Sequence, residues 1–243
     1  MLAHHLPENR KYLDLALKGV YSSENVDFEC ILVSSYILKD LPDYPNLKII
    51  EGEHLTSATL KYQTAVKNIS PTSEYIMFLS DDVFISRHLL ATQLEVSRQG
   101  DFILNPFSNG ELGTRFVSAM DLTHDTEPNT FFRLRPDITI EEFQGFTESA
   151  NQAQGIQKFM TVEPYVCFYC TMMSKKSWDA IGPLDPKLDV RHNDQDYCMR
   201  GKKLGIHSII NLGAFAIHFG TKTLNKAHKP EEFEAASRYF LEK

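Results

Sequence analysis

The sequence predicts a single α/β domain with a mixed, mainly parallel central sheet and helices on both faces. Helical and extended hydrophobic patterns alternate through the first half at the spacing of βα units. Residues 75–79 form an unbroken apolar run, which is typical of a central strand buried on both faces. The chain has 243 residues, 42% of them hydrophobic, which is enough for one sizeable core. Ligands of such folds bind at the carboxyl ends of the strands, so functional residues are expected there.

Hydrophobic spacing places the elements of the first half. Leu13, Ala16, Leu17 and Val20 recur at i, i+3, i+4 and i+7, which predicts an amphipathic helix. Ser86 precedes another helical stretch and is expected to cap it. The expected helices cover residues 8–21, 58–69 and 86–97, and the expected strands cover residues 28–33, 47–50, 75–79 and 101–106.

The second half is less regular. Residues 107–136 carry no clear pattern, whereas a capping-box pattern at 139–142 predicts a helix towards residue 152. Gly182 and Gly205 are expected to end helices, and Gly213 is expected to separate two short strands. The expected elements are a strand at 162–173, helices at 175–181 and 193–204, two strands within 207–219 and a final helix from Pro230.

The charge distribution excludes some classes of protein. A net charge of -7 disfavours a surface that attracts nucleic acid or anionic lipid uniformly. Residues 174–229, however, hold ten Lys or Arg against five Asp, which leaves room for a local anion-binding face. No apolar run approaches the ~20 residues of a membrane-spanning helix, and the first residues do not resemble a signal peptide. These features predict a cytoplasmic protein with no transmembrane segment.

The four cysteines do not indicate a disulfide scaffold. Cys167 and Cys170 have the spacing of a redox or zinc motif, but they lie in an extended run in which positions three apart face opposite sides. We therefore interpret the cysteines as small buried hydrophobic residues.

Two carboxylates follow the most hydrophobic strand. The run Ser80, Asp81 and Asp82 is expected at the carboxyl edge of the sheet. Adjacent carboxylates resist ionisation unless a cation or hydrogen-bond donors are near, so a hard divalent metal and its phosphates are natural partners. The alternative is a polar turn before a helix, in which Asp-Asp is common.

Two further residues, Asp194 and His218, have functional potential. Asp194 is expected at the mouth of a helix, where its carboxylate could accept a proton from a hydroxyl or simply cap the helix. Asp196 and Arg200 should pair at i, i+4 on that helix. His218 follows an apolar strand and could complete a metal site with Asp82, although a lone histidine is more often packed or hydrogen-bonded.

The order of these motifs resembles that of the family 2 glycosyltransferases and their relatives with the GT-A fold. The similarity is sharp over residues 57–82 and 165–223 and absent between 107 and 161. The matching segments are an acidic motif after a buried strand (78–83), a strand and helix (166–182), a Gly-Xaa-hydrophobic-Asp turn (182–185), an acidic helix start that ends in Arg (193–200) and a strand that ends in His (216–220).

The resemblance implies a metal-dependent, inverting transfer of a hexosyl or pentosyl group from a nucleoside diphosphate sugar, most simply a UDP-sugar. Mn2+ or Mg2+ would be held by Asp82 and His218, and Asp194 would be the general base. Asp81 and Ser80 would contact the donor, and Lys222 would meet its phosphates. The acceptor would be a hydroxyl of a glycan, lipid, protein or modified nucleic-acid base.

The resemblance also divides the single domain. Residues 1–106 would be the nucleotide-binding half, 107–161 a variable insert, and 162–243 the acceptor and catalytic half with a C-terminal helix. The sequence departs from the family where Leu32 to Ser35 lack an acidic base-binding residue, where Ser80 replaces the first Asp of the metal motif, and where Asn193 replaces an acidic residue.

Two other functions fit the same motifs. A non-catalytic protein of this fold could bind a nucleotide-sugar or a glycan, although the joint presence of Asp82, Asp194 and His218 argues against this. A metal-dependent nucleotidyltransferase would use similar nucleotide and metal chemistry, but it would form or exchange a phosphoanhydride instead of releasing a nucleoside diphosphate.

Overall fold

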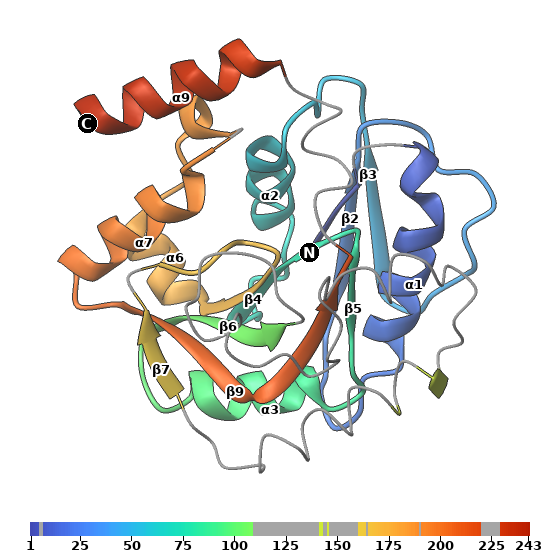
Figure 1. The fold of residues 1–243 in the computed structure, drawn as a ribbon. Coiled ribbons are helices and arrows are strands. Elements are labelled where there is room, and N and C mark those ends of the chain that lie inside the picture. The colour runs from blue at the N-terminus through green and yellow to red at the C-terminus, as the bar shows by residue number, and fades with distance from the viewer. Residues whose placement is uncertain are drawn as a thin grey trace.

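The protein folds as an α/β domain around one mixed sheet (Figure 1). The computed structural model describes residues 1–4, 7–108, 141–142, 145, 160–163, 165–189, 191–219 and 229–243. Lys222 and nearly all of the helix predicted at 139–152 lie outside these residues, as does most of the insert predicted at 107–161. No helix in the described part is both long and apolar enough to cross a membrane.

The strand order is β3-β2-β1-β4-β8-β6-β9-β5, and β7 also pairs with β9. The strands β1 to β4 form a parallel group, while β8 runs antiparallel to both β4 and β6, and β5 and β7 run antiparallel to β9. The strands are β1 (Leu2–His4), β2 (Cys30–Ser34), β3 (Leu47–Glu51), β4 (Tyr75–Ser80), β5 (Val83–Ile85), β6 (Phe102–Ser108), β7 (Met160–Glu163), β8 (Cys170–Ser174) and β9 (His207–His218).

Helices cover both faces of the sheet, as the sequence predicts (Figure 1). The apolar stripe of α1 packs on one face, where α3 also lies, and α2, α6 and α7 bury their apolar residues on the other. The helices are α1 (Arg10–Tyr21), α2 (Ala58–Val66), α3 (Leu89–Ser97), α6 (Lys175–Ile181), α7 (Asn193–Lys203) and α9 (Pro230–Glu242), with short 3-10 turns at Pro7–Asn9 and Pro186–Leu188.

The prediction of a single strand at 162–173 is wrong, because the chain turns within this segment. Strands β7 and β8 are separate, and the Tyr169 amide donates to the Cys167 carbonyl at 2.9 Å. The buried side chain of Asn105 on β6 holds this turn. Its Nδ2 donates to the Cys167 carbonyl at 2.6 Å, and its Oδ1 accepts from Thr171 Oγ1 at 2.7 Å. A turn fixed by a distant asparagine leaves no signal in local hydrophobic spacing.

Two smaller predictions also need correction. Residues 207–219 form one long strand instead of two, and the expected break at Gly213 is a shift in the pairing of β9 with β6. Ser86 does not cap α3, which begins after His88, and its Oγ has no hydrogen-bond partner among the described residues. The intervening strand β5 occupies the chain up to Ile85, so the helix begins later than its composition suggests.

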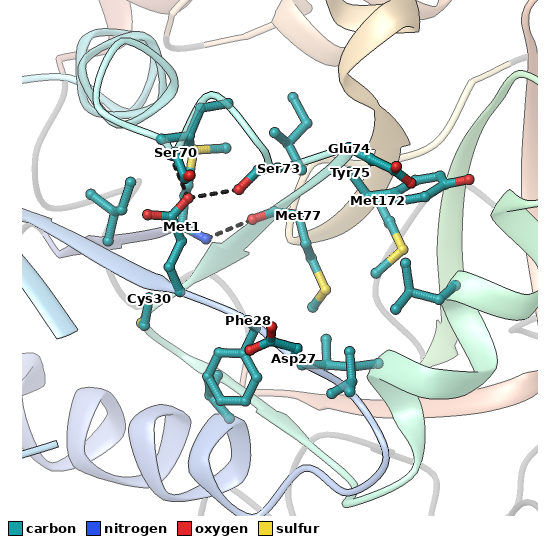
Figure 2. Close-up of a pocket in the computed structure, with 18 of the residues that line it drawn as sticks. Met1, Asp27, Phe28, Cys30, Ser70, Ser73, Glu74, Tyr75, Met77 and Met172 are labelled. Atoms are coloured by element: carbon teal, nitrogen blue, oxygen red, sulfur yellow. Dashed lines mark hydrogen bonds between the residues drawn. The ribbon is translucent and has the colours of Figure 1, made fainter. Parts of the chain in front are cut away.

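A cavity of about 460 Å³ lies at the amino ends of β1, β2 and β4 (Figure 2). In it the Met1 ammonium donates to the Met77 carbonyl at 2.7 Å, and Glu29 accepts from Ser70 and Ser73. None of the predicted site residues that the structure describes lines this cavity. It lies at the edge of the sheet opposite to the one at which the carboxylates are found.

Candidate functional site

The two carboxylates lie at the carboxyl end of the central strand, as predicted. Asp81 and Asp82 form the turn between β4 and β5, and they are only 2% and 5% exposed. The preceding strand β4 is apolar and lies inside the sheet, so the turn that follows it is buried instead of exposed at the surface. Buried carboxylates require a compensating partner, which distinguishes this turn from an ordinary solvated one.

His218 provides one such partner. Its Nε2 lies 3.3 Å from Asp82 Oδ1, and both side chains are largely buried. The pairing of the two strands creates this contact, because His218 is opposite Val83 in the ladder and the Phe219 amide donates to the Asp82 carbonyl at 2.9 Å. The prediction that these two residues lie together is therefore confirmed by the geometry, while their role remains a proposal.

One turn connects this pair with Asp194. The Tyr169 ring stacks on the His218 ring with centroids 4.8 Å apart and an angle of 12°. Two residues earlier, the Cys167 side chain hydrogen-bonds to the Asp194 carboxylate. The Cys167 to Tyr169 turn, which Asn105 holds, thus contacts both predicted functional groups.

Asp194 lies in the first turn of α7, where the sequence places it. Its Oδ1 accepts from the Gln195 amide at 2.8 Å, while His192 occupies the N-cap position without a side-chain cap bond. Burial raises the pKa of Asp194, an effect that its hydrogen bonds and the nearby His192 oppose. The expected pair of Asp196 and Arg200 is present, with 2.9 Å between Oδ2 and Nε. Asp194 is therefore a half-buried carboxylate beside the site, and a stronger base than an exposed one.

Lys61 is a charged residue of the site that the sequence interpretation missed. It lies on α2, is completely buried, and interacts electrostatically with Asp189 and Asp81. Burial lowers its pKa to about 8, although the two carboxylates oppose this shift. The sequence does indicate that Lys61 is buried, because it lies between Ala58 and Ala65 on the apolar face of the predicted helix.

Two tyrosines lie close to the same strand end. The Tyr62 side chain hydrogen-bonds to Ser80, and burial raises its pKa, as do the charges of Asp81 and Asp82. Burial also raises the pKa of Tyr36, which follows β2 and experiences the charge of Asp81. The structure therefore brings Ser80, Asp81, Asp82 and His218 together, and it adds aromatic side chains that the sequence motifs do not specify.

The Asp82 and His218 pair is compatible with a divalent cation. Two adjacent donors around an octahedral Mg2+, each at about 2.1 Å, lie about 3 Å apart. The observed 3.3 Å is close to this separation. No group of three or more His, Cys, Asp or Glu side chains in the described residues could hold a metal, so the pair would need ligands beyond these side chains, such as those of a bound molecule or water. The oxygen atoms of a diphosphate have the required chemistry.

The four cysteines are free thiols, and Cys167 and Cys170 form neither a disulfide nor a metal cluster in the described part of the chain. Cys30, Cys170 and Cys198 are buried, and Cys167 is partly exposed. Burial raises the pKa of Cys30, Cys170 and Cys198, so these three are unreactive structural thiols.

The fold of the chain is similar to the folds of three solved glycosyltransferase structures. GalNAc-T7 with UDP, GalNAc and Mn2+ superposes with a TM-score of 0.62 at 8% identity, over 89% of this chain and 43% of that chain. S. aureus TarS 1-349 in complex with UDP-GlcNAc superposes with a TM-score of 0.55 at 14% identity, over 98% of this chain and 64% of that one. A further TarS structure gives a TM-score of 0.55 over 98% of this chain and 38% of that chain.

These likenesses show that the chain has the GT-A fold of glycosyltransferases. The chain spans less than two thirds of the length of each of the three. No protein-family model matches the sequence, and no curated protein is significantly similar to it. The fold predicted from the motifs is therefore confirmed, while the assignment to family 2 stays a prediction.

Proposed function

We propose that this protein is a metal-dependent glycosyltransferase that moves a sugar from a nucleoside diphosphate sugar, most simply a UDP-sugar, to an acceptor hydroxyl. The observation that carries the proposal is the buried pair of Asp82 and His218, at 3.3 Å, beside Asp81 at the carboxyl end of the central strand. Folds of this class bind nucleotides at that edge of the sheet. UDP or a UDP-sugar is also present in the similar structures of GalNAc-T7 and TarS.

Residues at the carboxyl ends of β4 and β9 would share the binding of the donor and its cation. Asp82 and His218 would hold Mn2+ or Mg2+, and Asp81 and Ser80 would contact the donor. When bound, the cation would offset negative charge on the departing diphosphate. Lys61 is close enough to Asp81 to feel its charge, so its ammonium would add positive charge to this end of the site. Lys222, which lies outside the described residues, would do the same for the phosphates.

Asp194 would act as the general base. Its burial raises its pKa, which makes the carboxylate a better proton acceptor than an exposed one. Removal of the proton from the acceptor hydroxyl would let its oxygen attack the sugar from the face opposite the diphosphate, which inverts the anomeric centre. Residues 1–106 would bind the nucleotide, and residues 162–243 would supply Asp194 and the acceptor side.

A direct test combines donor binding and product analysis. Thermal unfolding should be followed with UDP and Mn2+, and with UDP and a chelator, in the wild type and in Asp82→Ala. We expect UDP to stabilise the wild type much more with Mn2+, and we expect Asp82→Ala to lose the difference. Asp27→Ala is a matched control, because Asp27 is an exposed carboxylate at the opposite edge of the sheet.

The products separate the competing functions. A panel of UDP-sugars with candidate hydroxyl acceptors should yield UDP and a glycoside of inverted configuration, which NMR of the anomeric proton detects. In a parallel assay with UTP and a sugar 1-phosphate, formation of a UDP-sugar with release of pyrophosphate would instead favour a nucleotidyltransferase. Metal-dependent donor binding without transfer to any acceptor or to water would favour a binding protein. Equal stabilisation by UDP with Mn2+ and with chelator would contradict the proposal.

A further inference from the structure

The C-terminal helix α9 packs against the residue that precedes the first turn of α7. The His192 ring stacks on Phe240 of α9 with centroids 4.6 Å apart and an angle of 6°. Its Nε2 lies 3.1 Å from Ser237 Oγ, also on α9, and its Nδ1 is hydrogen-bonded to Gln195 Oε1 in α7. His192 therefore joins the two helices through one face of its ring and through both ring nitrogens.

A second group of contacts joins α9 and the residue after it to Asp185 and Asp196. Lys243, which follows α9, reaches Asp196 Oδ1 at 2.7 Å and Asp185 Oδ2 at 2.9 Å. Tyr239 donates to the same Asp185 oxygen at 3.1 Å. Asp196 is only 5% exposed and also pairs with Arg200, so two cationic side chains, Arg200 and Lys243, bind its carboxylate.

The segment between α6 and α7 is also fixed by α2. Asp189 Oδ1 accepts from the Thr59 amide at 2.7 Å, and Gln63 Nε2 donates to the Leu184 carbonyl at 2.7 Å. The same helix carries the buried Lys61, which interacts electrostatically with Asp189 and Asp81. The segment that leads into α7 is therefore held between α2 and α9.

His192 has a backbone conformation that needs such support. Its φ of 66° is in the left-handed region, which a histidine adopts infrequently, and it lies where the chain turns into α7. The Asp196 amide donates to the His192 carbonyl at 2.9 Å, which closes the first turn of the helix around Asp194. Helix ends fray easily, so the orientation of this turn depends on its external contacts.

We propose that α9 is a clamp that positions Asp194 for proton transfer, and that His192 and Phe240 are its central positioning residues. The inference rests on the proposed function of Asp194 as general base. His192 and Asp196 flank Asp194 at two residues on either side, and α9 contacts both. Loss of the clamp lets the first turn of α7 move, which misplaces the carboxylate without changing the donor site.

The test uses three substitutions within α9. Phe240→Ala removes the ring that stacks on His192, Phe240→Tyr keeps it, and Arg238→Ala changes an exposed residue of the same helix. We expect Phe240→Ala to lower kcat by about 10- to 100-fold, which is the cost of a displacement near 1 Å. The affinity for UDP with Mn2+, measured by calorimetry, should stay unchanged, and both control variants should retain the wild-type kcat.

A second readout does not depend on catalysis. Hydrogen exchange of the amides in residues 193–197 should be faster in Phe240→Ala than in the wild type and unchanged in Arg238→Ala, while β4 keeps its protection. If the wild type transfers no sugar but this pattern holds, the proposed function of Asp194 fails, while the finding that α9 holds the first turn of α7 stands. Unchanged exchange and kcat in Phe240→Ala, a parallel loss of UDP affinity, or a Phe240→Tyr variant as impaired as Phe240→Ala would each overturn the clamp.

Discussion

His218 Nε2 lies 3.3 Å from Asp82 Oδ1, and the register of β5 against β9 determines this separation. Val83 is paired with His218, and the Phe219 amide bonds to the Asp82 carbonyl, so the two side chains emerge at adjacent points of the ladder. A slip of one residue would move His218 to the other face of the sheet. The contact is therefore a property of the strand pairing and does not depend on a mobile loop.

The first prediction concerns metal affinity. His218→Ala should weaken Mn2+ binding in the presence of UDP by at least about 10-fold. This is the lower end of the loss caused by mutating residues that only hydrogen-bond to a metal ligand, and a ligand itself should matter at least as much. Titration of Mn2+ followed by electron paramagnetic resonance measures the free ion directly. Tyr169→Phe is the matched control, because it keeps the ring that stacks on His218. Identical Mn2+ affinity in His218→Ala and the wild type would show that the histidine is structural.

The second prediction separates binding from catalysis. Asp194→Asn keeps the shape of the side chain and its oxygen acceptor for the Gln195 amide, but it removes the basicity. Sugar transfer should fall by at least about 100-fold, while affinity for UDP with Mn2+ persists. Asp179→Asn is the matched control, because it makes the same substitution at an exposed residue of α6 away from the site. Near-normal transfer by Asp194→Asn would limit Asp194 to a role in capping the helix.

The third prediction is that Asp194→Asn also stabilises the protein. Burial raises the pKa of Asp194, so the folded state disfavours the ionised form, and stability is lost as the pH rises through the folded-state pKa. The asparagine variant does not carry this penalty. Its melting temperature should exceed that of the wild type at pH 7, and the advantage should shrink as the pH falls towards the ordinary Asp pKa of about 3.9. A variant that melts below the wild type at pH 7 would contradict this reasoning.

The fourth prediction concerns the buried Lys61. Its pKa is lowered to about 8 in the folded protein, while in the unfolded chain it is about 10.4. Between these values the unfolded state binds more protons, so the contribution of Lys61 to stability should increase as the pH rises from about 8 to about 10.4. The difference in melting temperature between the wild type and Lys61→Met should therefore shift in favour of the wild type over this interval. A constant difference would indicate that Lys61 titrates normally.

Local sequence patterns were sufficient for most helices. The spacing of Leu13, Ala16, Leu17 and Val20 predicts α1, and these residues form its buried face. Gly182 ends α6 with a φ of 85°, as expected for a glycine after a helix. Such signals are short in range, because capping residues and i, i+4 stripes act within one element.

Pairings between distant segments account for the errors. The single strand expected at 162–173 is divided by a turn that Asn105 holds from β6, and the two strands expected around Gly213 are one strand because β6 pairs along it. Lys61 was overlooked because only the packing of α2 against the sheet brings its ammonium near Asp81 and Asp189. Each of these features depends on partners far away in the sequence.

The sequence by itself determined the fold class and the positions of Asp81, Asp82, Asp194 and His218 at the ends of elements. Polar residues after an apolar run mark where a strand ends, and acidic residues such as Asp194 mark where a helix begins. Only the tertiary structure decided which of these ends meet. The antiparallel register of β5 on β9 brings Asp82 and His218 together, and the Cys167 to Tyr169 turn contacts His218 and Asp194. The contacts of α9 with His192 likewise come from packing between helices, which the order of residues along one helix cannot specify.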